Sequence, residues 1–591
     1  MKLNLEFCKK EESLGIEEKE LNSQIEKNID NYEIVKEDDT SIELMLALSK
    51  IRQNIINWYK FKTDTQILEI GANYGEITGY LCRVSKNVTS LELSKEKAEI
   101  IAKRHSNKEN LECIVGNLED IQINKKFDYI TIIGQIEKAS KWFPNSNNPE
   151  KDLLLLASKM LKEDGKILIA TDNKFGIQYW NGKKDLEGTL EYKNLIEDRT
   201  ENGSKLFSER KFKELIEEIG YKNYKFYYAL PDYKMPNLIY SKDYKITKED
   251  ISRNFQYYEK DEVVNFGENG VYLELLDESK EILNFFANSF FVEIGNQTIE
   301  NDIKYIAFTN YRKEKYRIMT IIKEEEVIKK ATNKLAKEHI NSILKSNLEF
   351  NKTNAKIIEE KKDEKIVSKY INSERFDIFL ERVDEKSFIE NFEKYANILY
   401  QNSLEFKQVE NNIELKETIK SYDIKKLEKM KFAENAYIDF IPKNCFLIDD
   451  IFHVFDQEWT EKYMPVEYII YRAIQNSNLR EKRKELLNQK YNIKENEDLF
   501  IKLEKEFKEK LVDDIMLKQI FNRKTVNREE IVATMNHYYN LKNIADVEKI
   551  KLEEEIKKLK KEIENIYNSK TWKIAETLIN IKNLGTKKGN K

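Results

Sequence analysis

Short apolar runs alternate with longer amphipathic stretches through the first 250 residues of the chain. The runs that we expect to form buried strands lie at residues 66–70, 88–91, 111–115, 127–133 and 166–170. Segments with helical spacing of apolar positions lie at residues 44–58, 75–85, 94–105 and 151–161. Strands that alternate with helices form a parallel sheet covered on both faces. We therefore predict an α/β fold of the Rossmann-like, doubly wound type for this part.

The pattern changes after residue 245. It is mainly helical to about residue 288, and a strand at residues 290–294 is expected to close this linker. Short apolar runs at residues 304–308, 316–322 and 326–329, followed by a helix at residues 333–344, predict an antiparallel sheet and a new α+β domain.

Near the C-terminus, the apolar positions Leu552, Ile556, Leu559, Ile563 and Ile566 are separated by steps of four and three. This spacing predicts a coiled-coil seam. The seam is short, so a helix that packs back on its own chain is as well supported as a homo-oligomer. The tail beyond it carries Trp572 and several lysines, which suits peripheral contact with an anionic membrane; a frayed basic tail is the alternative.

We therefore divide the chain into a helical leader (1–40), an α/β domain (41–245), a helical linker (246–298), an α+β domain (299–540), a coiled coil (541–570) and a basic tail (571–591).

Composition limits the classes of function. The chain has 591 residues, with 101 Lys and Arg against 106 Asp and Glu, so a basic nucleic-acid-binding protein is not indicated. No apolar run approaches the roughly 18 residues of a membrane-spanning helix. The four cysteines are scattered without a Cys-x-x-Cys pair, which suits a reducing compartment. We expect a cytoplasmic protein.

The first candidate site is the turn that follows residues 66–70. Gly71, Ala72 and Gly75 bring the backbone close to any ligand that lies at the start of the next helix. Glu92 ends the next apolar run, where a Rossmann-type fold places an acid that binds ribose. The alternatives are ordinary turn glycines and a helix-capping glutamate.

Four sequence features together resemble the class I S-adenosylmethionine-dependent methyltransferases over about 200 residues: Leu68-Glu69-Ile70-Gly71, Glu92, the turn Val115-Gly116-Asn117-Leu118, and Phe127-Asp128-Tyr129-Ile130 leading to Gly134. The resemblance implies that S-adenosylmethionine is the cofactor. Glu69 and Gly71 would line its methionine end, Glu92 would accept its ribose hydroxyls, Asn117 and Leu118 would border its adenine, and Gly134 would lie beside it. Asn117 also suits an ordinary turn.

Residues 171–180 and 227–236 resemble a subgroup of this family that is associated with bacterial surface-glycan synthesis. A hydroxyl acceptor benefits from a base, whereas an ionised phosphate does not. His105 is expected on the outer face of its helix. Without a histidine base in this region, the sequence favours either an acceptor that is already ionised or a carboxylate base such as Asp172 or Asp232.

The second candidate site lies in the α+β domain. Asp439 and Asn444 are five positions apart, and Asp456 ends a strand about a dozen residues later. This spacing resembles that of kinase-like enzymes. The resemblance implies that Asp439 orients the accepting hydroxyl, that Asn444 and Asp456 hold Mg, and that Lys329 contacts the phosphates of ATP. Glu338 would hold Lys329.

The kinase-like part also departs from that pattern. It has no glycine-rich loop, and Gln457-Glu458 follow Asp456. A non-catalytic, pseudokinase unit is therefore kept as an alternative.

The order of these parts resembles the bifunctional enzymes that terminate O-antigen chains by phosphorylation and methylation. We predict a methyltransferase that acts on a surface polysaccharide or its phosphorylated terminus, with a coupled kinase activity. The partners implied are a glycan or lipid-linked glycan acceptor, and glycosyltransferases recruited by the coiled coil. The alternative is a non-catalytic scaffold for glycan assembly.

Overall fold

The computed structural model describes residues 1–8, 16–30, 41–121, 123, 125–181, 183–186, 192–254, 268–513, 551–552, 555–563 and 565. The chain divides into two compact units, Met1–Asn522 and Arg523–Lys591, each considered by itself. In the described part of the chain, no helix combines the length and the apolar character needed to cross a membrane.

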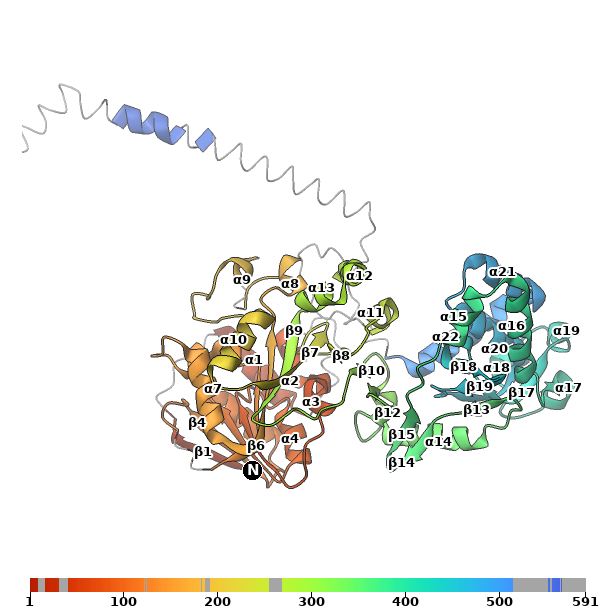
Figure 1. The fold of residues 1–591 in the computed structure, drawn as a ribbon, viewed down its shortest axis with the longest axis horizontal. Coiled ribbons are helices and arrows are strands. Elements are labelled where there is room, and N and C mark those ends of the chain that lie inside the picture. Colours follow the sequence, from red (N-terminus) through yellow and green to blue (C-terminus); the bar gives the residue numbers. More distant parts are fainter. Residues whose placement is uncertain are drawn as a thin grey trace, which may run out of the picture. The chain divides into compact units, whose positions relative to one another are not determined.

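A parallel sheet forms the first half of the larger unit (Figure 1). Its strands run in the order β1 (Lys2–Phe7), β4 (Leu111–Gly116), β3 (Asn87–Glu92), β2 (Gln66–Ile70), β5 (Phe127–Ile133) and β6 (Leu161–Asp172). All five strands predicted from the apolar runs are present, so the α/β prediction is confirmed.

Successive residues of each strand belong to different hydrophobic cores, as the two faces of a pleated sheet require. Leu68 packs in the core that includes Leu153 and Leu154 of α7 (Pro149–Met160). Ile67 packs in the core that includes Leu81 of α4 (Thr78–Val84) and Ile101 of α5 (Lys95–Arg104). The sheet is therefore covered on both faces.

The segment predicted as one helix at residues 44–58 is instead three short ones: α2 (Ile42–Leu48), the 3-10 helix Lys50–Gln53, and α3 (Asn54–Asn57). The break falls at Ser49. Its backbone is extended, with φ −64° and ψ 128°, and its hydroxyl accepts a hydrogen bond from the Ile51 N–H. Serine at such a position starts a new helix instead of continuing the old one.

Two segments outside the predicted α/β domain complete its sheet. Lys2–Phe7, expected to be helical, is strand β1 at the edge of the sheet. The strand expected to close the linker is β9 (Ser289–Gly295), which lies antiparallel between β6 and β7 (Asn223–Leu230). Helices α11 (Lys248–Asn254), α12 (Glu268–Glu278) and α13 (Lys280–Phe285) lead to it. The described part of residues 246–298 therefore contributes a strand to this sheet.

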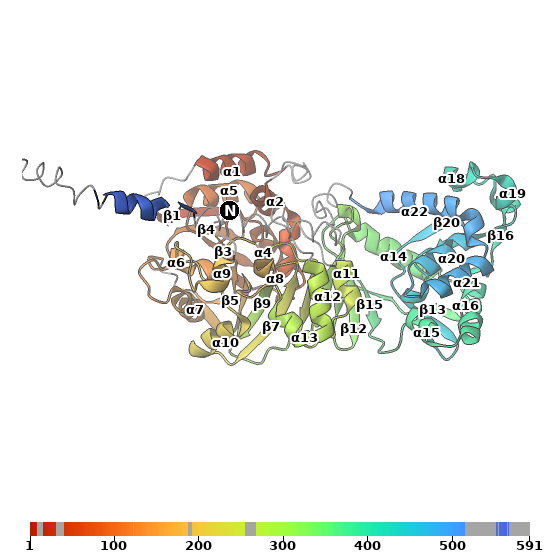
Figure 2. The same cartoon turned by 90° about the horizontal axis from the view of Figure 1, so that it is seen from above.

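The sheet continues into the second half of this unit. After β8 (Leu238–Ser241) come β10 (Tyr305–Phe308), β11 (Ile318–Ile322), β12 (Glu326–Ala331), β15 (Lys365–Lys369) and β14 (Glu360–Lys362), each antiparallel to its neighbour. Helix α14 (Lys337–Glu349) packs on β12 and β15 (Figure 2). The predicted antiparallel sheet and its following helix are present.

The remaining elements surround a separate hydrophobic core. The strands form two small sheets. The first has the order β13 (Ala355–Ile357), β19 (Ile451–Val454), β18 (Cys445–Ile448). The second has the order β16 (Leu404–Glu405), β17 (Lys431–Tyr437), β20 (Thr460–Pro465). The helices include α15 (Phe376–Arg382), α16 (Glu385–Leu399), α20 (Val466–Gln475) and α22 (Glu497–Leu511).

In the smaller unit, residues 551–552, 555–563 and 565 are helical. Leu552, Ile556, Leu559 and Ile563 of the predicted seam are exposed. Ile566 and residues 571–591 lie outside the described residues. The coiled coil therefore stays a prediction.

Candidate active sites

The turn after β2 contains residues with positive φ angles, a backbone conformation that favours glycine. Gly71 and Gly75 have φ angles of +79° and +76°, and Asn73 has +48°. A Cβ at Gly71 would lie 2.2 Å from Cδ of Gln135. Gly71 is therefore required both by the turn and by the close approach of a side chain from the loop after β5.

His105 lies beneath this turn and not on the outer face of α5, so that prediction is wrong. Its Nε2 is 2.8 Å from the carbonyl oxygen of Gly75. Burial lowers the pKa of His105 to about 4. The imidazole is neutral near pH 7 and supports the turn.

Glu92 lies at the end of β3 and is buried. Its Oε2 accepts a hydrogen bond from the Asn73 N–H at 2.8 Å, and its Oε1 accepts from the Leu93 and Ser94 N–H groups at 2.9 and 3.2 Å. The cap of α5 is the Ser94 hydroxyl, which excludes the helix-cap alternative for Glu92. Because a carboxylate oxygen accepts about two hydrogen bonds, Oε2 has capacity for a ligand hydroxyl.

Glu69 is buried under the same turn. Its Oε2 accepts hydrogen bonds from the hydroxyls of Thr78 and Ser90, both at 2.6 Å. Burial raises the pKa of Glu69 to about 7, although both hydroxyls lower it. Glu69, Gly71 and Ala72 line a narrow space of about 10 Å³ at the turn.

Asn117 and Leu118 form the turn after β4. The Asn117 side-chain oxygen accepts a hydrogen bond from the Glu119 N–H at 3.3 Å, and Leu118 is packed in the core. The turn role of Asn117 is therefore observed, and its contact with adenine stays a prediction.

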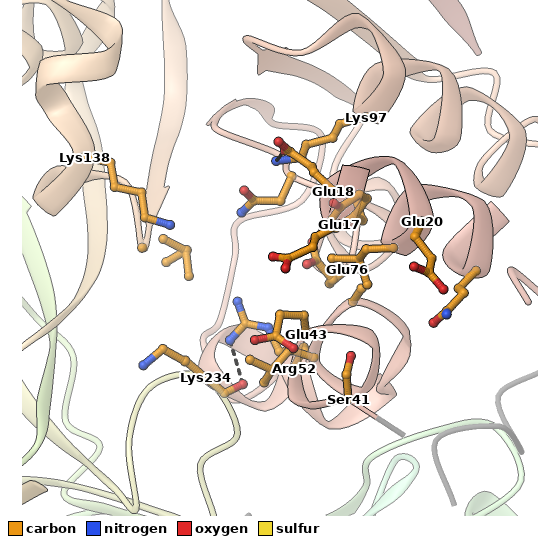
Figure 3. A pocket seen from close by; sticks show the side chains of 18 of the residues that line it. Glu17, Glu18, Glu20, Ser41, Glu43, Arg52, Glu76, Lys97, Lys138 and Lys234 are labelled. Carbon is orange, nitrogen blue, oxygen red and sulfur yellow. Dashed lines mark hydrogen bonds and ion pairs between the residues drawn. The ribbon is translucent and has the colours of Figure 1, made fainter. Parts of the chain in front are cut away.

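A cavity of about 700 Å³ opens at the carboxyl ends of β2 and β5 (Figure 3). Asn73 and Gly134 contribute to it from the sheet side. Its other wall is α1 (Ile16–Lys27) together with α2, which the sequence patterns did not place there. The charged lining residues are Glu17, Glu18, Glu20, Glu43, Glu76, Arg52, Lys97, Lys138 and Lys234.

Asp172 and Asp232, predicted on the acceptor side, are brought together by Lys234. Its Nζ lies 2.9 Å from Asp172 Oδ2 and 3.6 Å from Asp232 Oδ2. Both aspartates are buried. Tyr233 and Lys234 lie within residues 227–236, whose resemblance was noted, but no role was predicted for Lys234. Glu137 was missed, because the 3-10 helix that carries it, Ile136–Lys138, is too short to show a periodic pattern.

A second cluster lies in the other half of the unit. Lys329 of β12 is buried, and its Nζ lies 2.7 Å from Glu359 Oε1 and 2.5 Å from Asp456 Oδ1. Glu338 is exposed on α14 and does not hold Lys329. The carboxylate that holds it is Glu359, between β13 and β14, so the Glu338 prediction is wrong.

Asp439 and Asn444 lie next to this cluster. Asp439 Oδ2 accepts hydrogen bonds from the Glu458 and Trp459 N–H groups at 3.2 and 3.1 Å, and the Asn444 side-chain amide donates to the Asp439 carbonyl at 3.0 Å. Burial raises the pKa of Asp439 to about 7. Among the described residues, no three His, Cys, Asp or Glu side chains gather as a metal-binding group. Asn444 and Asp456 therefore stay candidates for Mg that would act together with nucleotide phosphates.

Comparison with known proteins gives one family match. Residues 68–169 match the family model described as a methyltransferase domain. No curated protein matches the chain.

Solved structures are also similar to the chain. A TehB-like SAM-dependent methyltransferase from Corynebacterium glutamicum is 12% identical, with 42% of this chain and 88% of that chain covered and a TM-score of 0.23. A phosphoethanolamine N-methyltransferase from Haemonchus contortus is 13% identical, with 48% of this chain and 49% of that chain covered and a TM-score of 0.28. The match to the methyltransferase family model covers β2 to β6, the strands that carry the glycine turn and Glu92.

Proposed function

We propose that the chain uses S-adenosylmethionine to methylate a bacterial surface polysaccharide or the phosphorylated terminus of one. The match of residues 68–169 to a methyltransferase family model supports this. The cofactor supplies an electrophilic methyl group. The protein aligns the acceptor with it and excludes water.

The residues present fit this cofactor. Glu92 offers a carboxylate oxygen with spare capacity for ribose hydroxyls at the end of β3. The positive φ angles of Gly71 and Gly75 hold the turn close to any ligand beside β2. The cavity beside Asn73 and Gly134 has a volume of about 700 Å³, which is in the usual range for a ligand of this size.

A group of aromatic residues supports a carbohydrate acceptor. The side chain of Asn173, which directly follows β6, donates a hydrogen bond to the Phe285 carbonyl at 2.8 Å. Phe285 stacks on Phe175 with ring centroids 5.3 Å apart, and Trp180 is 50% exposed. Aromatic faces pack well against the C–H faces of sugar rings.

The test is methyl incorporation from labelled S-adenosylmethionine into extracted lipid-linked glycan. We expect Trp180→Ala to lower incorporation about tenfold while the affinity for S-adenosylhomocysteine, measured by calorimetry, is unchanged. The matched control is Ile196→Ala, at another exposed apolar residue. No binding of S-adenosylhomocysteine by the wild-type protein would end the methyltransferase proposal.

We propose a second activity, Mg-dependent phosphorylation of the glycan end by ATP, on the strength of the Lys329, Glu359 and Asp456 cluster. A buried lysine between two carboxylates, near Asp439 and Asn444, is a suitable arrangement for phosphoryl transfer. Lys329 would contact the phosphates, and Asn444 and Asp456 would hold Mg. Asp439 would orient the accepting hydroxyl.

Magnesium-dependent ATP consumption that Asp456→Ala abolishes would support this activity. If no nucleotide binds, the second half is a pseudokinase, and the proposal becomes a glycan-assembly scaffold joined to the methyltransferase. Recruitment of glycosyltransferases by residues 541–570, and peripheral membrane contact by residues 571–591, belong to the same proposal.

A further inference from the structure

Tyr233 lies directly over the carboxyl end of β5. Gly134, the residue after this strand, has a φ of +67°, and a Cβ there would lie 2.5 Å from the phenol oxygen of Tyr233. Both residues line the large cavity. The hydroxyl of Tyr233 is therefore at the point in the methyltransferase half where an acceptor would approach the sheet.

The Tyr233 hydroxyl donates a hydrogen bond to Glu137. The distance to Glu137 Oε1 is 3.1 Å, and the other carboxylate oxygen, Oε2, accepts from the Thr171 hydroxyl at 3.0 Å. Glu137 is 1% exposed. Tyr233 thus connects the cavity with a carboxylate that solvent hardly reaches.

The two groups differ in their protonation. Burial and the neighbouring Asp172 raise the pKa of Glu137 above its ordinary value. Burial raises the pKa of Tyr233 well above that of a free phenol, so Tyr233 stays protonated at neutral pH. Tyr233 can therefore pass a proton to Glu137 but does not store a negative charge itself.

The predicted carboxylate bases are less suited to this task. Lys234 forms ion pairs with Asp172 and with Asp232. In addition, the Asp232 Oδ1 atom accepts a hydrogen bond from the backbone N–H of Lys234 at 2.8 Å. Both carboxylates are therefore already engaged by Lys234, whereas Glu137 accepts hydrogen bonds from hydroxyl groups.

Other charged groups act on the same pair. The guanidinium of Arg52 and the ammonium of Lys234 lie 5.9 and 5.1 Å from the centre of the Tyr233 ring. The remaining charged groups near the pair are Lys138, Asp172 and Asp232. The cations favour the ionised form of Glu137, and the aspartates oppose it.

We propose that Tyr233 and Glu137 take the proton from a hydroxyl acceptor, so that the methyl group goes to a sugar hydroxyl and not to a phosphate oxygen. This inference rests on the proposed methyltransferase function. As the bond between the acceptor oxygen and the methyl carbon forms, the acceptor proton passes to the Tyr233 oxygen. The Tyr233 proton passes to Glu137 Oε1. The cofactor leaves as a neutral thioether, and Glu137 becomes a neutral acid.

The test compares Tyr233→Phe and Glu137→Gln with Tyr227→Phe. Tyr227 is buried on β7, and its hydroxyl has no hydrogen-bond partner among the described residues, so its loss should leave the site unchanged. The assay is methyl incorporation into extracted lipid-linked glycan. Calorimetry with S-adenosylhomocysteine is the second readout.

We expect Tyr233→Phe and Glu137→Gln to lower kcat by about 100-fold, the usual size of an acid–base effect. Their affinity for S-adenosylhomocysteine should stay within about threefold of wild type. The wild-type rate should rise with pH through the pKa of Glu137, which lies above the ordinary value of 4.5. This rise should be absent in Glu137→Gln. A wild-type rate that is flat across this range would overturn the proposal even if the variants fail to fold.

The product separates the two acceptors. Hydrogen fluoride treatment, which cleaves phosphate esters, should leave the labelled methyl group on the sugar. Release of the label with phosphate would show a phosphate acceptor and overturn the inference, while the methyltransferase proposal would stand. Absence of any incorporation by the wild-type protein would refute both.

Discussion

At the scale of single residues, the site depends on close contacts that a glycine permits. Gly134 and Gly220 both have positive φ angles, +67° and +97°. A Cβ at Gly134 would collide with Tyr233, whereas a Cβ at Gly220 would meet nothing within 4 Å. An added Cβ would strain the backbone at both positions, but only at Gly134 would it also displace a functional group.

We expect Gly134→Ala to lower methyl incorporation at least tenfold because it displaces the Tyr233 hydroxyl. Gly220→Ala should retain activity, although each substitution costs about 1 kcal/mol in stability for the left-handed backbone. Activity assays and thermal melts measure the two effects separately. Equal activity of the two variants would show that the position of Tyr233 does not matter.

His105 gives a prediction about pH and stability. Its pKa is about 4 in the folded protein and about 6.5 in the unfolded chain, because burial opposes its charge. The unfolded chain therefore binds more protons between these values, and stability falls as pH drops from about 6.5 to 4. The loss attributable to His105 is up to about 3 kcal/mol.

This pH dependence is checked by urea unfolding at pH 7.5 and pH 4.5. In His105→Gln, the difference in stability between the two pH values should be smaller than in wild type. An unchanged difference would mean that the imidazole titrates normally. Direct NMR titration of the ring gives an independent answer.

The site residues that could be predicted from the sequence are those at the ends of predicted strands. Gly71 and Glu92 follow apolar runs, and the carboxyl ends of parallel strands meet at one edge of a sheet. His105 was misplaced because α5 ends at Arg104, and His105, with φ −116° and ψ 26°, leaves the helical phase. Glu137 lies in the short 3-10 helix Ile136–Lys138 and Tyr233 in the loop after β7, and the conformation of both depends on contacts distant in sequence.

At the scale of elements, the errors have a common cause. β9 lies between β6 and β7, more than 50 residues from either in sequence. Its apolar run predicts a strand but cannot identify its neighbours. β1 was missed although Leu3, Leu5 and Phe7 alternate with polar residues, a strand pattern that the polar leader obscured.

Helix α1 forms one wall of the cavity, and its attachment is testable. Ile25 is fully buried against Leu44 and Met45 of α2 and Tyr74 of the turn. We expect Ile25→Asn to detach α1 and to weaken S-adenosylhomocysteine binding about tenfold, because a buried polar group without a partner costs about 1–3 kcal/mol. Calorimetry measures the affinity.

The control for this helix is Ile196→Asn, which introduces the same side chain at an 82% exposed position on α9 (Lys193–Ile196). It should bind S-adenosylhomocysteine as wild type does. If both variants bind normally, α1 is not needed to hold the cofactor.

In the second half, Glu359 and not Glu338 is expected to govern nucleotide binding. Glu359 Oε1 holds the Lys329 ammonium at 2.7 Å, whereas Glu338 is exposed. Glu359→Gln should weaken Mg-ATP binding about tenfold, because Lys329 would then pair with Asp456 alone. Glu338→Gln should have no effect. Fluorescence titration with an ATP analogue distinguishes them, and equal affinities would contradict the role of Glu359.

At the scale of the whole larger unit, one sheet joins both candidate sites. Within the described residues the sheet has 14 strands, and β8 and β10 connect the methyltransferase strands to those that carry Lys329. The sequence predicted the two halves but not their continuity, because periodicity shows where strands are and not which strands pair.

An ionic cluster makes a second connection between the halves. Glu249 of α11 lies 2.6 Å from Arg375 and 2.9 Å from Lys443, the residue before Asn444. Arg375 also pairs with Asp377 at 3.0 Å. Burial alone would raise the pKa of Glu249, but Lys443 and Arg375 lower it to about 2. The charge of one carboxylate therefore holds two cations of the other half.

The lowered pKa of Glu249 sets the direction in which stability changes with pH. The ordinary pKa of Glu249 is 4.5, so its contribution is fully present above that value and is lost as pH falls toward 2. After allowance for solvent screening, the contribution at neutral pH is about 1–2 kcal/mol. Glu249→Gln should lower stability by this amount at pH 7 and by less at pH 3, as measured by urea unfolding.

The control is Glu281→Gln, at an exposed position on α13, which should change the stability at neither pH. A Glu249→Gln effect that does not depend on pH would mean that the cluster stabilises the unit by packing, and that the charge of Glu249 is not what joins the halves.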